Sequence, residues 1–566
     1  MRTKYSRRRR LGRATHDLSL LRDAHHHSRS NRHAEEGPQP AARNRGASEG
    51  QDPGETAAQD WRESGEPRLR QSTRLKTVCQ PLRFTLALRW LIVTAPSSTS
   101  GQKASAVKVA FIVSLAVLLT LALLRFSDWP REAALMAGIF VLAALLWVTE
   151  ATPLFATSLL VIGLQVILLA NPGGWAGLGF ATGTSPGYRA VLAAAADPIL
   201  LLFFGGFLLA RAAVKEGVDQ AMSSLLLRPF GGQPKAVLLG LMLVTALFSM
   251  WMSNTATTAM MMTLVVPMLA QLPPNEIFRK GLVLAVPLAA NIGGMGTPIA
   301  SPPNAVAVGF LQKAGIKIGF LDWMLVAVPL MLLLLLLVWL LLDHFFKPTT
   351  SGLRLEAASR SLNRRGWFVV VVFFVTVLLW MTDQWHGLPS SVVALLPAVA
   401  FTTTGLLNRD DLNGIEWNIL ILIAGGISLG AGMQMAGLDQ QVVKWLPSGG
   451  TSGTLLLAAL VVATIGLSTF MSNTAAANLL LPVGISSAMA LGGAGLSGTQ
   501  AALSIALAAS LSMSLPISTP PNAIAYASGE FTTRDLMRVG VIIALAGALL
   551  IIAGSGFVLR FWGITL

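Results

Sequence analysis

The sequence has a single cysteine and unusually little charge. Because Cys79 is alone, the chain can form neither an internal disulfide nor a zinc or iron–sulfur site built from several cysteines. Charged residues make up 12% of the 566 residues, whereas hydrophobic residues make up 53%. This composition disfavours secreted disulfide-rich domains, collagen and soluble enzymes, and it predicts a membrane protein.

Histidine is scarce where catalysis would need it. Five of the seven histidines lie within the first 33 residues, and the other two, His344 and His386, fall at the ends of apolar stretches. An intramembrane serine hydrolase needs a base beside its nucleophile, and histidine is the usual choice. We therefore expect that the protein is not an enzyme.

Positive charge is concentrated at the N-terminus, where residues 1–100 hold 19 of the 42 Lys and Arg residues. Residues 1–80 have no sustained apolar period, which predicts a disordered basic tail. Residues 81–106 include an apolar stretch too short to cross a bilayer, which predicts an interfacial segment. The run Arg7–Arg10 is compatible with a patch for nucleic acid or anionic lipid, but a solvated tail, or a start codon assigned too early, is the favoured interpretation. We expect no nucleic-acid partner.

Long apolar stretches follow over residues 107–566, separated by short polar or Pro/Gly segments. Two stretches, 235–270 and 453–491, are interrupted in the middle by a polar cluster, which is typical of re-entrant hairpins. We predict an all-α polytopic membrane protein with about 11 transmembrane helices and two re-entrant hairpins. The predicted spans are 107–124, 133–149, 153–170, 198–214, 281–311, 324–346, 366–381, 389–407, 416–433, 500–526 and 536–559.

One basic loop predicts the orientation in the membrane. Residues 347–366 carry five Lys or Arg residues against one acid, which predicts a cytoplasmic location for this loop. Six predicted crossings separate it from the basic tail, so the N-terminus is expected in the cytoplasm and the C-terminus outside. We expect a bacterial inner membrane.

Three sequence blocks occur twice, in the same order and at offsets of 218–220 residues. The duplication spans about 140–310 and 373–528. One of these blocks contains the cluster Ser-Asn-Thr, at 253–255 and again at 472–474. Five predicted crossings lie between the two clusters, and an odd number of crossings places the second copy upside down in the membrane relative to the first. Inverted repeats with interrupted helices at corresponding positions are typical of secondary transporters. The paired blocks are Asp197–Gly206 with Trp417–Gly426, Ser253–Ala256 with Ser472–Ala475, and Ser301–Ala305 with Thr519–Ala523.

The duplicated motifs suit ion binding. At a Ser-Asn-Thr break, the side chains can cap the following half-helix while the preceding half-helix ends in free carbonyls. The new helix start suits an anion, and the carbonyls suit a small hard cation. The Pro-Pro pairs at 302–303 and 520–521 break two further helices, and Gly293, Gly294 and Gly296 allow close backbone approach.

The segments that carry these motifs are free of charge. Residues 236–275, 281–312 and 445–529 contain no Asp, Glu, Lys or Arg. A cationic substrate would normally meet an intramembrane carboxylate, and a dianion would normally meet Arg or Lys. We therefore predict a site without fixed charge, in which co-bound Na⁺ supplies the charge that a dianion needs.

At these motifs the chain resembles the divalent anion/sodium symporters, which carry dicarboxylates, citrate or sulfate. The resemblance covers about residues 107–566, and the segment Trp147–Pro153 adds to it. It implies Na⁺-coupled symport of a C4-dicarboxylate such as succinate, with no organic cofactor. It also implies a homodimer in which a transport domain with two hairpins moves elevator-fashion against a scaffold domain.

The resemblance also implies a set of site residues. The run Thr474–Asn478 departs from the family's threonine-rich continuation, which bears on the choice of anion. The substrate would be bound by Ser253, Asn254, Thr255, Ser472, Asn473, Thr474, Thr519 and Pro520. One Na⁺ site would use Ser249, Ser253, Asn254 and the carbonyl of Ala300, and the other Ser468, Asn473 and the carbonyls of Met471 and Ser518.

Several alternatives remain at this stage. A sodium-independent dicarboxylate exchanger, a sulfate or citrate transporter and an anion channel fit much of the same pattern. A Ser-Asn-Thr cluster can also serve as a kink or an interhelical polar contact. Two inverted broken-helix hairpins favour alternating access over a continuous pore.

Overall fold

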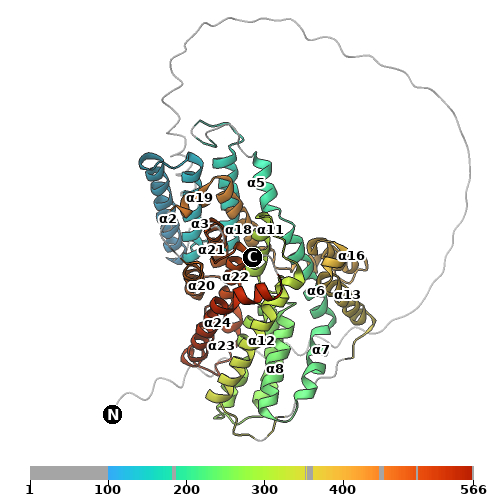
Figure 1. Cartoon of the computed structure of the whole chain (residues 1–566). Coiled ribbons are helices and arrows are strands. Elements are labelled where there is room, and N and C mark those ends of the chain that lie inside the picture. The colour runs from blue at the N-terminus through green and yellow to red at the C-terminus, as the bar shows by residue number, and fades with distance from the viewer. Residues whose placement is uncertain are drawn as a thin grey trace, which may run out of the picture. The chain divides into compact units, whose positions relative to one another are not determined.

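The computed structural model describes helices over most of the predicted transporter unit, and within its described residues it contains no strand, only an isolated bridge between Gly232 and Leu353 (Figure 1). This confirms the predicted all-α class. The predicted tail, 1–80, lies outside the described residues, as does most of the predicted interfacial segment. The structure describes residues 100–176, 178–180, 187–350, 352–353, 361–444, 452–491 and 495–563.

Eight helical segments in the described part of the chain are long and apolar enough to cross a membrane. The predicted number of about 11 is not confirmed, because some predicted spans consist of shorter pieces. One of the eight consists of α5 and α6, which are separated by the residues 196–198. The segments are α2 (Ser100–Phe126), α3 (Arg131–Thr149), α5 (Tyr188–Ala195) with α6 (Ile199–Glu216), α12 (Phe320–Phe345), α13 (Arg364–Met381), α18 (Trp417–Met435), α20 (Gly453–Phe470) and α24 (Thr533–Phe561).

Every predicted interruption at a duplicated motif is a helix boundary. A helix begins at the Asn of each Ser-Asn-Thr cluster and at the first Pro of each Pro-Pro pair, where proline suits the first helical turn. The elements around the breaks are α8 (Pro234–Ser249), α9 (Asn254–Ala270), α10 (Phe278–Gly293), α11 (Pro302–Lys313), α21 (Asn473–Ala490), α22 (Gly498–Ala509) and α23 (Pro520–Tyr526).

Shorter elements connect these helices. In Figure 1, α2 lies beside α3, and α13 and α16 lie beside α6. The connecting elements are α4 (Leu154–Leu164), the π-helix η1 (Gln165–Ala170), α7 (Val218–Leu227), the 3₁₀ turn η2 (Arg228–Phe230), α14 (Asp383–His386), α15 (Ser390–Val393), α16 (Leu395–Thr403), α17 (Arg409–Asn413) and α19 (Leu438–Val443).

Side-chain caps form at only one of the two Ser-Asn-Thr clusters. The Ser253 hydroxyl accepts the Ala256 N–H at 3.3 Å and so caps α9. Ser472 occupies the same position before α21, but its side chain makes no cap bond, so the expected cap is wrong there. The first amides of α21 are therefore left without an acceptor from this side chain.

The two sequence copies make matching contacts. Trp147 and Trp380 are both fully buried, and each indole N–H donates to a backbone carbonyl just downstream, on Leu154 at 3.2 Å and on Ser390 at 2.9 Å. These contacts fix the chain entering α4 and α15 in the same way. The duplication is therefore visible in the packing as well as in the sequence.

The asparagines of the Pro-Pro-Asn loops also match. Asn304 donates to the carbonyls of Gly294 and Thr297 at 2.9 and 2.8 Å. Asn522 donates to the carbonyls of Met513 and Leu515 at 3.0 and 2.9 Å. Each asparagine ties the start of a short helix to the non-helical segment that precedes it. Backbone carbonyls of the break are satisfied in this way.

Candidate functional site

The duplicated motifs line one cavity of about 600 Å³. Its wall is built by the first residues of α9 and α21, the start of α18, and the Pro-Pro loops that precede α11 and α23. Helices α9 and α21 start at this cavity at a Ser-Asn-Thr cluster, and α11 and α23 start there at a proline pair. All eight residues expected to bind substrate lie on the wall, namely Ser253, Asn254, Thr255, Ser472, Asn473, Thr474, Thr519 and Pro520.

Oxygen atoms converge where the resemblance implies the first Na⁺ site. The hydroxyl oxygen of Ser249 lies 2.7 Å from Asn254 Oδ1 and 2.7 Å from the Ala290 carbonyl oxygen. Ser249 itself is fully buried behind the cavity, while Ala300 contributes to the cavity wall. Several neutral oxygen atoms this close to one another suit a hard cation such as Na⁺.

Close backbone approach makes this cluster possible. A Cβ atom built on Gly294 would lie 2.5 Å from both amide atoms of Asn254, and one built on Gly293 would lie 2.5 Å from the Ala246 carbonyl. One on Gly296 would lie 2.7 Å from the Met250 side chain. The predicted use of these three glycines is thus confirmed.

A buried hydroxyl without a partner marks the implied second Na⁺ site. Ser468 is fully buried near the end of α20, and its hydroxyl has no hydrogen-bond partner among the residues that the structure describes. Met471, three residues later, lines the cavity together with Ser518, whose hydroxyl donates to the Thr469 carbonyl at 2.9 Å. Asn473 Oδ1 accepts from Ser512 at 2.9 Å. Burying a hydroxyl without a partner costs free energy, so this atom fits a position that a cation contacts.

Sequence reasoning missed Asn291 and Ser512. Asn291 is 2% exposed, lines the cavity and donates to Thr519 Oγ1 and Asn522 Oδ1, each at 3.1 Å. It therefore links the first sequence copy to the second. Neither residue lies in a duplicated block, so only the fold brings them to the motifs.

The prediction of a site without fixed charge is wrong. Glu150 and Glu416 both line the cavity. The Ser253 hydroxyl lies 3.5 Å from Glu416 Oε1, within hydrogen-bonding distance. The motif segments are indeed free of charge, but the rest of the wall comes from the turn before α4 and from the residue before α18. No Lys or Arg is among the described residues that line the cavity.

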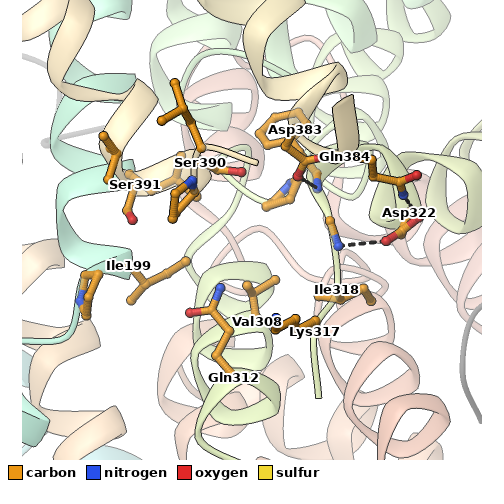
Figure 2. A pocket seen from close by; sticks show the side chains of 18 of the residues that line it. Ile199, Val308, Gln312, Lys317, Ile318, Asp322, Asp383, Gln384, Ser390 and Ser391 are labelled. Carbon is orange, nitrogen blue, oxygen red and sulfur yellow. Dashed lines mark hydrogen bonds between the residues drawn. The ribbon is translucent and has the colours of Figure 1, made fainter. Parts of the chain in front are cut away.

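A second, larger cavity of about 980 Å³ is lined by no described residue of the Ser-Asn-Thr clusters or the Pro-Pro-Asn loops (Figure 2). Figure 2 shows Asp383, Gln384 and Asp322 on one side of it and Lys317 on another. Asp322 accepts from the Gly319 N–H at 2.8 Å and from Gln384 at 3.0 Å. Part of the wall of this larger cavity is equivalent, in the sequence duplication, to part of the wall of the motif cavity. The equivalent pairs are Pro198 and Asn418, Ile199 and Ile419, Leu202 and Leu422, and Asp383 and Glu150.

Comparison with known proteins gives a consistent result. A family model described as the sodium:sulfate symporter transmembrane region matches residues 105–565. An uncharacterized transporter of Haemophilus influenzae is 32% identical over 456 residues, which cover 76% of this chain and 93% of that protein. The residues matched by the family model include both copies of the duplicated motifs and exclude the basic tail.

Two named relatives differ in what they carry. The sodium-dependent dicarboxylate transporter SdcS of Staphylococcus aureus is 29% identical over 479 residues, covering 77% of this chain and 88% of SdcS. The inorganic phosphate transporter PHO87 of Saccharomyces cerevisiae is 31% identical over 434 residues, or 74% of this chain, but this is 46% of that longer protein.

One solved structure supports the fold. The YdaH transporter of Alcanivorax borkumensis superposes with a TM-score of 0.51 at 16% identity, covering 77% of this chain and 99% of YdaH. At this identity the likeness bears on the fold alone.

Proposed function

This chain belongs to the sodium:sulfate symporter family, and we propose that it performs Na⁺-coupled symport of a divalent anion, with a C4-dicarboxylate such as succinate as substrate. The family and the apolar helices indicate a multi-pass membrane protein that acts as a transporter. The observation that carries the proposal is the shared cavity lined by both Ser-Asn-Thr clusters and both Pro-Pro loops. The similarity to SdcS supports the choice of a dicarboxylate.

The proposed anion contacts follow from the two helix starts at the cavity. The first amides of α9 and α21 point a positive partial charge toward the helix start, which favours an anion. The amide groups of Asn254 and Asn473 can donate to carboxylate oxygens from the same positions. In this proposal each motif binds one carboxylate.

The proposed Na⁺ ligands are neutral oxygens. One ion would be held by Ser249, Ser253, Asn254 and the carbonyl of Ala300. The other would be held by Ser468, Asn473 and the carbonyls of Met471 and Ser518. Bound Na⁺ supplies the positive charge that no described Lys or Arg on the cavity wall provides. The chain's own residues then orient the anion through hydroxyl, amide and backbone donors.

We propose that the second sequence copy is inverted and that α8–α9 and α20–α21 are re-entrant hairpins. The odd number of predicted crossings supports the inversion, and the matching contacts of Trp147 and Trp380 support the duplication itself. In the proposed elevator mechanism, the hairpins move with a transport domain inside a homodimer. We place the protein in a bacterial inner membrane with a cytoplasmic N-terminus.

Uptake of labelled succinate into proteoliposomes tests the proposed function. The initial rate is expected to rise steeply with external Na⁺ and to fall to background in choline. Unlabelled citrate, sulfate and phosphate serve as competitors, with phosphate included because of the similarity to PHO87. A rate that is unchanged in choline and driven by internal dicarboxylate would instead establish a sodium-independent exchanger.

Preloading the vesicles separates a transporter from an anion channel. Unlabelled succinate inside should accelerate entry of labelled succinate if the site alternates between the two sides. A channel shows no such acceleration, because its pore is open to both sides at once.

Replacement of Ser468 by alanine tests the second Na⁺ site. The variant removes a buried hydroxyl that has no partner in the described part of the chain, so the protein without ligand should be as stable as the unmodified protein or slightly more stable. Its gain in melting temperature on adding Na⁺ should shrink, because a ligand stabilises only protein that binds it. A full gain with Na⁺ would remove Ser468 from the site.

A further inference from the structure

Glu416 is the acidic residue of the cavity that directly contacts a motif side chain. It is half-buried, precedes α18, and its Oε1 lies 3.5 Å from the Ser253 hydroxyl. Ser253 caps α9 and belongs to both the proposed anion site and the proposed first Na⁺ site. A negative side chain therefore lies where the proposed function places an anion.

Other protein groups do not neutralise this charge. Glu416 forms no ion pair with Lys, Arg or His in the part of the chain that the structure describes. Asp411, the preceding acid on α17, is engaged by Arg211 at 3.2 Å and by Lys215. Helices α4, α9, α21 and α23, which also border the cavity, contain no charged residue. The cations of α10 and α11 face other acids: Arg279 pairs with Glu530, Lys280 with Asp535 and Lys313 with Asp197. Glu150, the other acid on the wall, is exposed and adds to the negative charge.

We propose that Glu416 makes anion binding depend on Na⁺, by repelling a divalent anion until a cation occupies the site that shares Ser253. The repulsion between a carboxylate and an anion a few ångströms away is large when few waters screen it. A cation between them reverses the sign of the local charge. This inference rests on the proposed function and extends it by naming a residue that sets the strength of coupling.

The dependence of succinate binding on Na⁺ is expressed by a coupling factor, which is the succinate affinity at saturating Na⁺ divided by the succinate affinity in choline. Glu416→Gln keeps the size of the side chain and a group that can hydrogen-bond to Ser253, but it removes the charge. We expect succinate to bind roughly tenfold or more tightly to this variant in choline. The affinity at saturating Na⁺ should change much less, so the coupling factor should fall by nearly the same ratio.

Equilibrium binding of labelled succinate to the full chain in detergent measures both affinities. Asp410→Asn is the matched control, because Asp410 is an exposed acid on α17 outside the cavity wall. Its coupling factor should equal that of the unmodified protein. Glu150→Gln should lower the factor less than Glu416→Gln does, because Glu150 makes no contact with Ser253 in the described structure.

Three results would overturn the inference. The first is an unchanged coupling factor in Glu416→Gln. The second is an equal fall in Glu150→Gln, which would assign the effect to the general potential of the cavity. The third is weaker succinate binding by Glu416→Gln at saturating Na⁺ with no gain in choline, which would make Glu416 a positioning residue for Ser253. Failure of the unmodified protein to bind succinate in Na⁺ would instead contradict the proposed function.

Discussion

Replacing Asn254 or Asn473 by alanine is expected to abolish saturable succinate uptake while leaving the stability of the ligand-free protein nearly unchanged. Each side chain lies at a helix start on the cavity wall and is only half-buried. Within the protein, Asn254 Oδ1 contacts Ser249 and Asn473 Oδ1 contacts Ser512, so little else is lost on truncation. Polar contacts between membrane helices average about 0.6 kcal/mol, which is too small to unfold the protein.

Melting temperatures measured without ligand and then with Na⁺ and succinate decide between a ligand and a packing role. A ligand residue should leave the first value nearly unchanged and remove the increment, since only protein that binds is stabilised. Gln384→Ala, an exposed amide in the cavity of Figure 2, is the control and should keep a full increment. A full increment in Asn254→Ala or Asn473→Ala would refute the assignment of that asparagine.

Gly294→Ala is expected to raise the Na⁺ concentration for half-maximal uptake by about tenfold or more, because one lost charge-assisted contact to an ion costs about 1.4 kcal/mol or more. The backbone of Gly294, with φ of −60° and ψ of −9°, accepts alanine without strain. The added Cβ would nevertheless lie 2.5 Å from the Asn254 amide and must displace it. The effect therefore acts through a proposed Na⁺ ligand.

Gly466→Ala is the control for this substitution. Gly466 lies inside α20, and a Cβ there would meet nothing within 4 Å. Alanine favours a helix over glycine by about 1 kcal/mol, so this variant should be slightly more stable with unchanged Na⁺ dependence. An unchanged Na⁺ dependence in Gly294→Ala as well would show that Asn254 tolerates the shift or does not bind the ion.

The sequence pattern predicts the helix breaks well because their cause is local. Pro302 and Pro520 lack a backbone N–H, which suits the first turn of a helix, and each is the first residue of a helix here. Gly294 and its neighbours were expected to allow close approach, and the contact with Asn254 bears this out. Ser472 makes no cap bond whereas Ser253 does, although the five residues Met-Ser-Asn-Thr-Ala are identical in both copies. A cap bond therefore depends on side-chain placement that these five residues do not determine.

Other parts of the site depend on contacts between distant segments. Glu416 lies outside the charge-free segments and reaches Ser253, 163 residues earlier, only through the packing of α18. Asn291 is 228 residues from Thr519, and no periodicity or repeat connects the two. The charge of a site is set by every segment that lines it. The motif segments alone therefore predict a neutral site, whereas Glu150 and Glu416 from other segments make it negative.

Span counting from the sequence was limited by helix length. Residues 281–311 and 500–526 each read as one apolar span, but each consists of two short helices with a break at the Pro-Pro pair. In contrast, α20 is long and apolar enough to cross a membrane although we interpret it as half of a hairpin. Apolar length does not distinguish a crossing from a segment that enters and returns.

The central claim is that Na⁺ and a divalent anion move together through the duplicated cavity, and paired fluxes of radioactive Na⁺ and labelled succinate test it most directly. In proteoliposomes held at zero membrane potential, external succinate should stimulate Na⁺ entry in a fixed ratio to its own entry. Asn254→Ala should remove both fluxes together. Succinate entry without any accompanying Na⁺ flux, at a rate that Na⁺ does not alter, would contradict the account.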